Sequence, residues 1–399
     1  MRFRCVLGSH AEVVVEADSV PAALLQTQAS GDTVLRFRQE APRASSPPVT
    51  EWELATFYRQ LASMLEAGVP LAQGLQVLAR DTTNPGLREV CYTLYLTLVN
   101  GEPLAAGLGK FPDLFPRLHV ALARAGERAG LLPITLSQTA DYLEHTGRLN
   151  RRFSSALVYP AVVGTIVILL LTSYWGSGVL MRILEVYKDL GISNRLPAMT
   201  RFVISFSRAA LPVALATIVT VFVLALLLRA YYRTRRGRYR LDRVKLWLPF
   251  LGEIASKGAV SRFARTLGLL LGNGVEVESA LELAGEASGN DVLARAAKGA
   301  IGPVVEGAPL AESLAAPGIF PAPVTDQIAT GEESGTLLTM LGSLADFYEA
   351  QTEHLTRAFS AVIEPALILI LGFIVGISIV SLMLPLVQVI ASLSTGGME

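Results

Sequence analysis

The stretch FYRQLASMLEAGVPLAQGLQVL, from Phe57 to Leu78, decides the fold, because it returns as FARTLGLLLGNGVEVESALELA from Phe263 to Ala284. The shift is 263 − 57 = 206 residues, and the same shift joins NGEPLAAGL at 100–108 to EGAPLAESL at 306–314. After one deletion, a shift of 205 joins GERAGLL at 126–132 to GEESGTL at 331–337. A single gap over so long an alignment indicates a duplicated unit.

The repeated unit has the periodicity of amphipathic helices. Apolar residues recur at the spacing of one buried helix face in both copies: Leu54, Phe57, Tyr58, Leu61 and Leu65, then Val260, Phe263, Ala264, Leu267 and Leu271. Thr50 and Glu53 predict a capping box before the first helix. Gly68 and Gly274 suit the left-handed position that ends a helix, and Pro70, Pro103 and Pro309 suit the first turn of the next. Short turns between such helices predict an antiparallel bundle in each copy.

The composition is that of a membrane protein. Of 399 residues, 51% are hydrophobic and 17% are charged, with a formal net charge of zero. Three stretches are apolar over a length that crosses a bilayer: 156–176, 209–228 and 365–390. The third carries Gly372 and Gly376 at the GxxxG spacing, which indicates either close packing of a partner helix or chance in a glycine-rich span.

Basic residues beside the spans predict the orientation. Arginines at Arg233, Arg235, Arg236 and Arg238 follow the second stretch, where they are expected to anchor the chain to anionic lipid at the cytoplasmic surface rather than to bind nucleic acid. The first thirty residues show no cleavable signal pattern. We therefore expect a cytoplasmic N-terminus, a multi-pass chain and a periplasmic C-terminus.

The expected fold class is an all-α integral membrane protein with two homologous cytoplasmic helical bundles, three transmembrane helices and a small N-terminal α/β module. The module is suggested by alternation in RFRCVL, EVVVEA and TVLRFR. The expected segments are the N-terminal module at 1–40, a linker at 41–50, the first repeat at 51–155, the spans at 156–176, 209–228 and 365–390, an external loop at 177–208, a basic cytoplasmic segment at 229–255, the second repeat at 256–364 and an external tail at 391–399.

The sequence lacks the common motifs of catalysis, nucleotide binding and metal binding. It has no phosphate loop, GxGxxG, HExxH or GxSxG, and its two cysteines and four histidines show no metal-ligand spacing. We therefore expect no catalytic, cofactor or metal site. Asp141 with Glu144, and Asp346 with Glu349, each lie three residues apart on one helix face, where they either bind a cation or face solvent.

Two duplicated features are candidates for a mechanical or partner-binding role. The G-E-x-x-G elements, Gly126/Glu127/Gly130 and Gly331/Glu332/Gly335, are either turn geometry with an acid near a helix N-terminus or a partner interface. Pro160 and Pro365 stand where the last helix of each copy meets an apolar stretch, and a proline there is expected to bend the helix as it enters the membrane.

Together, F-x-R-x-L, the GV turn, G-x-PL, G-E-x-x-G and the Y-P or E-P step resemble the platform proteins of type II secretion and type IV pilus machines. The resemblance implies a non-enzymatic scaffold of the bacterial inner membrane that couples a cytoplasmic hexameric assembly ATPase to the assembly of pilin or pseudopilin subunits. It also implies contact with other inner-membrane machine components and with membrane lipid, and self-association into a homo-oligomer. The alternative is a small membrane transporter or channel subunit.

Overall fold

The structure is a computed structural model that describes residues 2–7, 12–16, 34–39, 49–147, 162–166 and 251–395, with isolated positions and one short run between 220 and 243. Nearly all of the predicted spans at 156–176 and 209–228 lies outside these residues. So do Pro160 and the four arginines from Arg233 to Arg238. The predictions made for them stay predictions.

The N-terminal strands form one antiparallel sheet. It contains β1 (Arg2–Leu7), β2 (Glu12–Glu16) and β3 (Val34–Gln39) in the order β2-β1-β3. Cys5 stands opposite Val13 on one side and Phe37 on the other. These are the segments whose alternation predicts strands, and the helix expected in an α/β module falls on residues outside the described ones.

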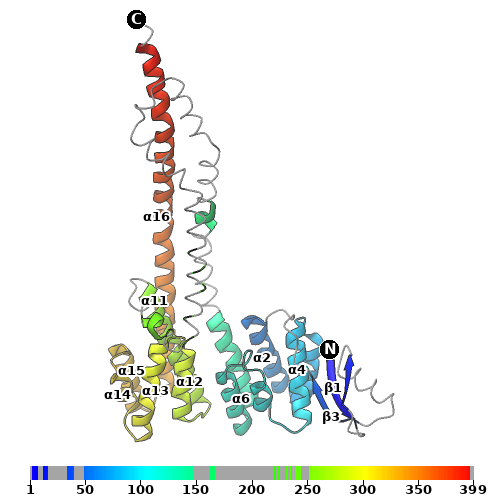
Figure 1. Cartoon of the computed structure of the whole chain (residues 1–399). Coiled ribbons are helices and arrows are strands. Elements are labelled where there is room, and N and C mark those ends of the chain that lie inside the picture. Colours follow the sequence, from blue (N-terminus) through cyan, green and yellow to red (C-terminus); the bar gives the residue numbers. More distant parts are fainter. Residues whose placement is uncertain are drawn as a thin grey trace.

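The two copies of the repeat fold into two helical bundles that stand next to each other (Figure 1). The first contains α2 (Glu51–Glu66), α3 (Leu71–Asp81), α4 (Pro85–Val99), α5 (Leu104–Gly109), α6 (Arg117–Ala129) and a helix over 132–147. The second contains α11 (Leu251–Gly272), α12 (Val277–Ala287), α13 (Asp291–Val305), α14 (Leu310–Ala315), α15 (Ala322–Glu333) and α16 (Leu337–Thr395). The helices follow each other in the same order in both copies, as the alignment predicts.

Local sequence signals set the ends of these helices. Thr50 and Glu53 form the predicted capping box in front of α2. Gly68 and Gly274 have φ angles of 82° and 72°, the left-handed conformation that glycine adopts without steric cost. Pro70, like Pro103 and Pro309, is the N-cap residue, so each proline precedes the first turn instead of lying within it.

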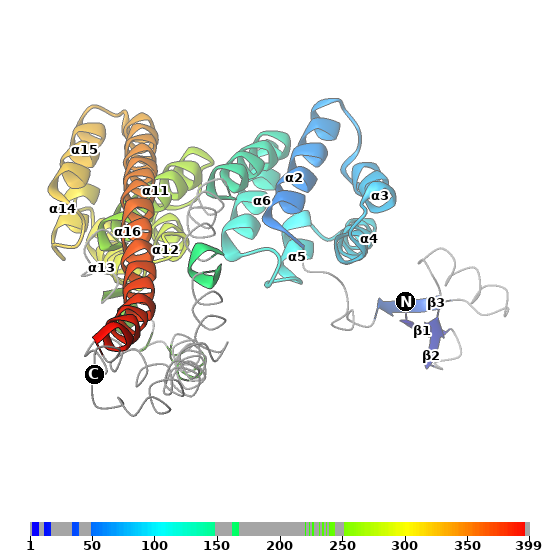
Figure 2. The same cartoon turned by 90° about the horizontal axis from the view of Figure 1, so that it is seen from above.

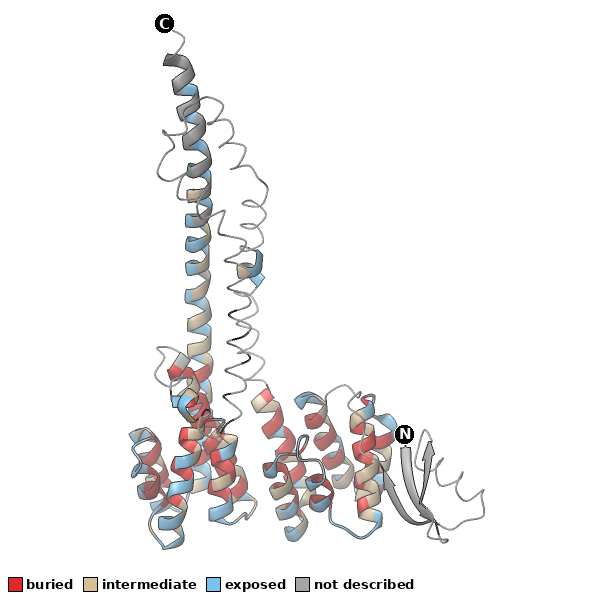
Figure 3. Cartoon of the chain, in the orientation of Figure 1, coloured by how far each residue is buried: buried red, intermediate tan, exposed pale blue. Residues whose placement is uncertain are grey.

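Each bundle has an apolar core on the faces that the periodicity predicts. Leu61 and Leu267, at the same repeat position, are fully buried, whereas Leu65 and Leu271 at the edge are partly buried. Figure 3 shows buried residues concentrated inside the bundles, and exposed and half-buried residues along the described part of α16 beyond the bundle.

The first bundle differs from the second by a buried polar pair. The Tyr58 hydroxyl lies 3.3 Å from Nδ1 of His119, and their rings meet edge to face. Burial lowers the pKa of His119 to about 4 and raises that of Tyr58. The second bundle has Ala264 and Val324 at these positions, so its core is apolar there.

The last helix, α16, runs for 59 residues and passes through Pro365 without ending. It is the one helix among the described residues that is long and apolar enough to cross a membrane. Apolar residues such as Ile368, Leu369 and Phe373 are exposed along it. A Cβ added at Gly372 or Gly376 would meet no atom of the described residues within 4 Å, so none of those residues packs closely against the predicted GxxxG surface.

The basic segment predicted at 229–255 contributes to the second bundle. Asp242 is buried, and its carboxylate accepts a hydrogen bond of 3.1 Å from the backbone N–H of Asp291, the first residue of α13. Arg295 lies 4.2 Å over the ring of Tyr239. The first helix of the bundle, α11, begins at Leu251, within that segment.

Candidate functional site

The duplicated glutamates of the G-E-x-x-G elements cap a neighbouring helix. The Glu127 carboxylate accepts hydrogen bonds from the backbone N–H groups of Leu104 and Ala105, at the start of α5. In the second copy, Glu332 accepts the equivalent bonds from Leu310 and Ala311, at 2.8 and 3.2 Å. A carboxylate placed on the free N–H groups of a helix N-terminus stabilises that helix. Each glutamate therefore caps the N-terminus of α5 or α14, and not that of the helix that follows it in the chain.

The glycines of the same elements allow a sharp turn and a close helix contact. Gly130 and Gly335 have φ angles of 69° and 70°, the left-handed region. A Cβ at Gly331 would lie 2.9 Å from the Met340 side chain, and one at Gly126 would overlap Thr135. The turn therefore needs glycine at both ends. Whether the exposed part of this element also binds a partner stays a prediction.

The paired acids bind an arginine of their own repeat. Arg59 on α2 contacts Asp141 at 2.6 Å and Glu144 at 2.8 Å. Arg265 on α11 contacts Asp346 and Glu349, both at 2.7 Å. The cation held by each acidic face is therefore a guanidinium, which ties the first helix of the bundle to the last. In the second copy this arginine clamp joins the bundle to α16.

The two bundles also contact each other through charged side chains. Arg117, at the start of α6, pairs with Glu282 at 3.2 Å and with Glu286 at 2.8 Å, both on α12. The hydrogen bond from Arg117 is the main cause that lowers the pKa of Glu282. The amide of Asn273 donates to Gln138 at 2.7 Å. These bonds link residues more than 100 positions apart.

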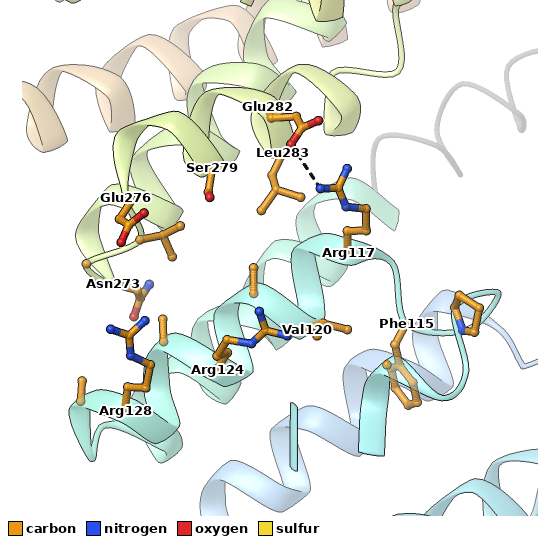
Figure 4. A pocket seen from close by; sticks show the side chains of 17 residues that line it. Phe115, Arg117, Val120, Arg124, Arg128, Asn273, Glu276, Ser279, Glu282 and Leu283 are labelled. Atoms are coloured by element: carbon orange, nitrogen blue, oxygen red, sulfur yellow. Dashed lines mark hydrogen bonds and ion pairs between the residues drawn. The ribbon is translucent and has the colours of Figure 1, made fainter. Parts of the chain in front are cut away.

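A cleft of about 790 Å³ lies between α6 and α12 next to this contact (Figure 4). Arg124 and Arg128 on α6 line one wall, and Glu276 and Ser279 line the other. Both arginines are exposed, and neither has an ion-pair partner in the part of the chain that the structure describes. The face of α6 is basic and the face of α12 is acidic, so their charges are complementary.

Sequence reasoning missed the inter-bundle contact and the arginine clamps. The signal for the clamps was present, because Arg59/Arg265 recur together with the acids that bind them. The inter-bundle residues do not recur: Arg117, Arg124 and Arg128 align with Ala322, Ala329 and Glu333 at the shift of 205. Among the described residues, no three His, Cys, Asp or Glu side chains are grouped to hold a metal ion.

Both copies of the repeat match the model of one known protein family. The model for "Type II secretion system (T2SS), protein F" matches residues 57–177 and 263–385, which contain the two copies. The chain is 38% identical over 347 residues to the type IV pilus assembly protein PilC of Thermus thermophilus, covering 86% of this chain and 84% of that protein. It is 33% identical to the Pseudomonas aeruginosa protein of the same name, covering 85% and 90%. It is 31% identical over 396 residues to the type II secretion system protein F of Xanthomonas campestris, covering 95% and 96%.

Proposed function

Because this chain belongs to the type II secretion system protein F family, we propose that it is the inner-membrane platform of a secretion or type IV pilus machine. In this role it couples a cytoplasmic assembly ATPase to the assembly of pilin or pseudopilin subunits into a fibre. Membership of this family supports a role as a component of such a machine, and the coupling role is our proposal.

One observation carries the proposal: α16 is a single helix that begins inside the second bundle and continues into an apolar stretch of membrane-spanning length. Its first part packs against α11 and is held there by the clamp of Arg265 with Asp346 and Glu349. A movement of the bundle is therefore passed to the membrane segment without an intervening loop. Such a connection suits a scaffold that transmits motion.

The wider topology belongs to the same proposal. Three spans, with both bundles in the cytoplasm and the C-terminus in the periplasm, give each bundle a helix that leads into the membrane. Arginines Arg233, Arg235, Arg236 and Arg238 hold the return span to anionic lipid, and Gly372 with Gly376 offers a surface for a helix of another machine component. Pro160 and Pro365 bend the two outgoing helices.

We place the binding site of the assembly ATPase at the ends of the bundles that carry the G-E-x-x-G turns. Gly335 lies in the turn before α16 and the exposed Leu338 lies in its first turn, whereas its apolar stretch follows Pro365. This end therefore lies remote from the membrane segment. A motor that binds there acts on the free end of α16.

A binding experiment tests the proposed contact with the assembly ATPase. It uses the purified full-length protein in nanodiscs and the cognate ATPase. Titration of the ATPase should give saturable binding, and charge reversal at Glu333 beside the turn should weaken it. No saturable binding by the unmodified chain would count against a platform role.

The proposed coupling role is tested by lowering the stability of α16 between the arginine clamp and the membrane segment. Exposed Ala358 and Ala361 are replaced together by glycine, which costs about 1 kcal/mol of helix stability per site. Fibre assembly in cells should fall while ATPase binding is retained. The matched variant Ala358→Ser with Ala361→Ser keeps a better helix former at both sites and should assemble more fibre. Equal assembly by both variants would refute a role for the continuous helix.

A further inference from the structure

The cleft between α6 and α12 has the size and the lining of a small-molecule site. Seen from above, the two bundles stand side by side, with α6 and α12 on the sides that face each other (Figure 2). The cleft between them has a volume of about 790 Å³, and most of its lining is apolar, including Val120, Val275 and Leu283. Sites for small ligands hold about 300–1,000 Å³, often lie between domains, and combine apolar walls with a few polar groups.

Two arginines of this cleft are placed to bind an anion. Arg124 and Arg128 stand one turn apart on α6, and their side chains point toward α12 (Figure 4). Both are exposed, and neither pairs with an acid among the residues that the structure describes. A guanidinium group presents N–H donors in a planar fork that matches the oxygens of a phosphate group, and two such groups lie within one turn here.

The fold of the repeat does not require these two arginines. At the shift of 205, Ala329 and Glu333 take their positions in the second copy, and the helix α15 forms there as α6 does in the first. The charge at both positions therefore differs between the copies while the helix is kept. Exposed cations that the helix does not need, and that point into a cleft, indicate a binding role.

The opposite wall of the cleft offers hydrogen-bond acceptors. The carboxylate of Glu276 is exposed and has no ion-pair partner in the described part of the chain, and the hydroxyl of Ser279 follows it on α12. The amide nitrogen of Asn273 donates to Gln138 and to the carbonyl of Leu269, both at 2.7 Å, so its own carbonyl oxygen remains as an acceptor. A ligand that spans the cleft therefore needs an anionic group at one end and N–H donors at the other.

The other charged groups next to the cleft neutralise each other. Arg117 binds Glu282 at 3.2 Å and Glu286 at 2.8 Å, and Glu282 also lies 3.7 Å from Lys298. Among the charged residues that line the cleft, this leaves two arginines on one wall and the carboxylate of Glu276 on the other. The unpaired charge is positive, so the cleft favours a ligand with a net negative charge.

We propose that this cleft binds a nucleotide, with its phosphates on Arg124 and Arg128 and the N–H groups of its base toward Glu276. The phosphates supply the negative charge that the arginines bind, and the base supplies donors for the acceptors of α12. Each bundle provides one wall, so the bound nucleotide joins the bundles and stabilises this arrangement of the two over others. The site consists of side chains from both copies, and no phosphate-loop motif marks it in the sequence.

Titration calorimetry of the full-length protein in nanodiscs tests the proposal without any partner protein. ATP, GTP and sodium triphosphate are titrated separately, and empty nanodiscs give the blank. Both nucleotides should bind with saturation, at one site per chain. Absence of saturable binding of either nucleotide to the unmodified chain would overturn the proposal, whatever the chain's role as a platform.

Variants assign the binding to the two walls of the cleft. Arg124→Ala with Arg128→Glu installs the residues of the second copy, in which this helix folds, and should weaken nucleotide binding at least roughly tenfold. Glu276 makes no side-chain cap bond, so Glu276→Ala leaves the start of α12 intact. This change should weaken nucleotide binding, because the base loses an acceptor, and strengthen triphosphate binding, because a repelling charge is removed. Arg80→Ala, at an exposed arginine of α3 outside the cleft, is the matched control and should leave all three affinities unchanged.

Two outcomes with these variants would contradict the proposal. Unchanged nucleotide binding by the double arginine variant would place the nucleotide outside the cleft. Tighter binding of all three ligands by Glu276→Ala would show a site for the phosphate chain alone, with no role for the base.

Hydrogen exchange measures whether the nucleotide joins the two bundles. Addition of ATP or GTP to the unmodified protein should slow amide exchange in both α6 and α12, because the ligand contacts one wall from each bundle. The double arginine variant should lose this protection. Protection confined to one bundle would refute a ligand that spans the cleft.

Discussion

The buried pair of Tyr58 and His119 predicts that the first bundle, and not the second, loses stability in mild acid. Burial lowers the pKa of His119 from 6.5 to about 4, so the ring stays neutral in the folded bundle. The unfolded chain takes up a proton below its pKa of 6.5, and the folded bundle does so only near 4. The stabilisation is therefore fully present above the unfolded pKa and is lost as the pH falls from 6.5 towards 4.

The size of the effect follows from this shift. Within the window, each pH unit costs about 1.4 kcal/mol of the free energy of unfolding, because one more proton is bound by the unfolded state. Between pH 7 and pH 5 the loss is about 2 kcal/mol, or roughly a 30-fold rise in the fraction of first bundles that are open.

Cys91 provides the assay, because it is fully buried in the first bundle. Labelling of the full-length protein in a Cys5→Ser background by a dipyridyl disulfide, which reacts with thiols in acid, measures how often this bundle opens. Burial also raises the pKa of the Cys91 thiol to about 12, which suppresses reaction without opening. The matched probe is Ala297→Cys in a Cys5→Ser, Cys91→Ala background, because Ala297 is fully buried at the same repeat position in the second bundle.

The ratio of the two labelling rates should rise roughly 30-fold from pH 7 to pH 5, since the effect of pH on thiol chemistry cancels. Replacing both residues of the pair by those of the second copy, Tyr58→Ala with His119→Val, should remove the pH dependence of the ratio. A ratio that stays constant in the unmodified chain would refute the assignment of a neutral, buried imidazole.

Other predictions concern the turns and the clamp of the second bundle. Glu332→Ala should cost about 1 kcal/mol and speed hydrogen exchange at the start of α14, because two N–H groups lose their acceptor. Gly335→Ala should lower the melting temperature through a strain of about 1 kcal/mol at a φ of 70°, whereas the same change at Gly299, within α13, should not lower it. Arg265→Ala should cost up to about 1 kcal/mol, measured by the urea midpoint, and high salt should shrink the difference because the clamp is partly exposed.

The comparison of the two copies predicted the bundles well, because their core faces and turn glycines are shared. Leu61 and Leu267 are buried as the periodicity requires, and Gly68 and Gly274 are left-handed. These features follow from local sequence, since a helix period and a required φ angle can be read within a few residues. The continuity of α16 was likewise predictable up to Pro365.

The contacts between distant segments could not be predicted in the same way. The role of Glu332 depends on α14, which precedes it by about twenty residues in the chain and meets it only in the folded bundle. Arg117 has no counterpart in the second copy, so comparison of the copies gave it no weight. Positions where the copies differ became informative only when the structure showed which of them face a neighbour.

The length of α16 has a mechanical consequence of its own. At 1.5 Å per residue, 59 residues make a rod of about 88 Å. A rod of this length is a lever: a tilt of about 5° imposed by the bundle displaces the far end by roughly 8 Å, more than one helical turn. If the bundle that carries the arginine clamp tilts, the far end of α16 is therefore displaced much further than the end within the bundle.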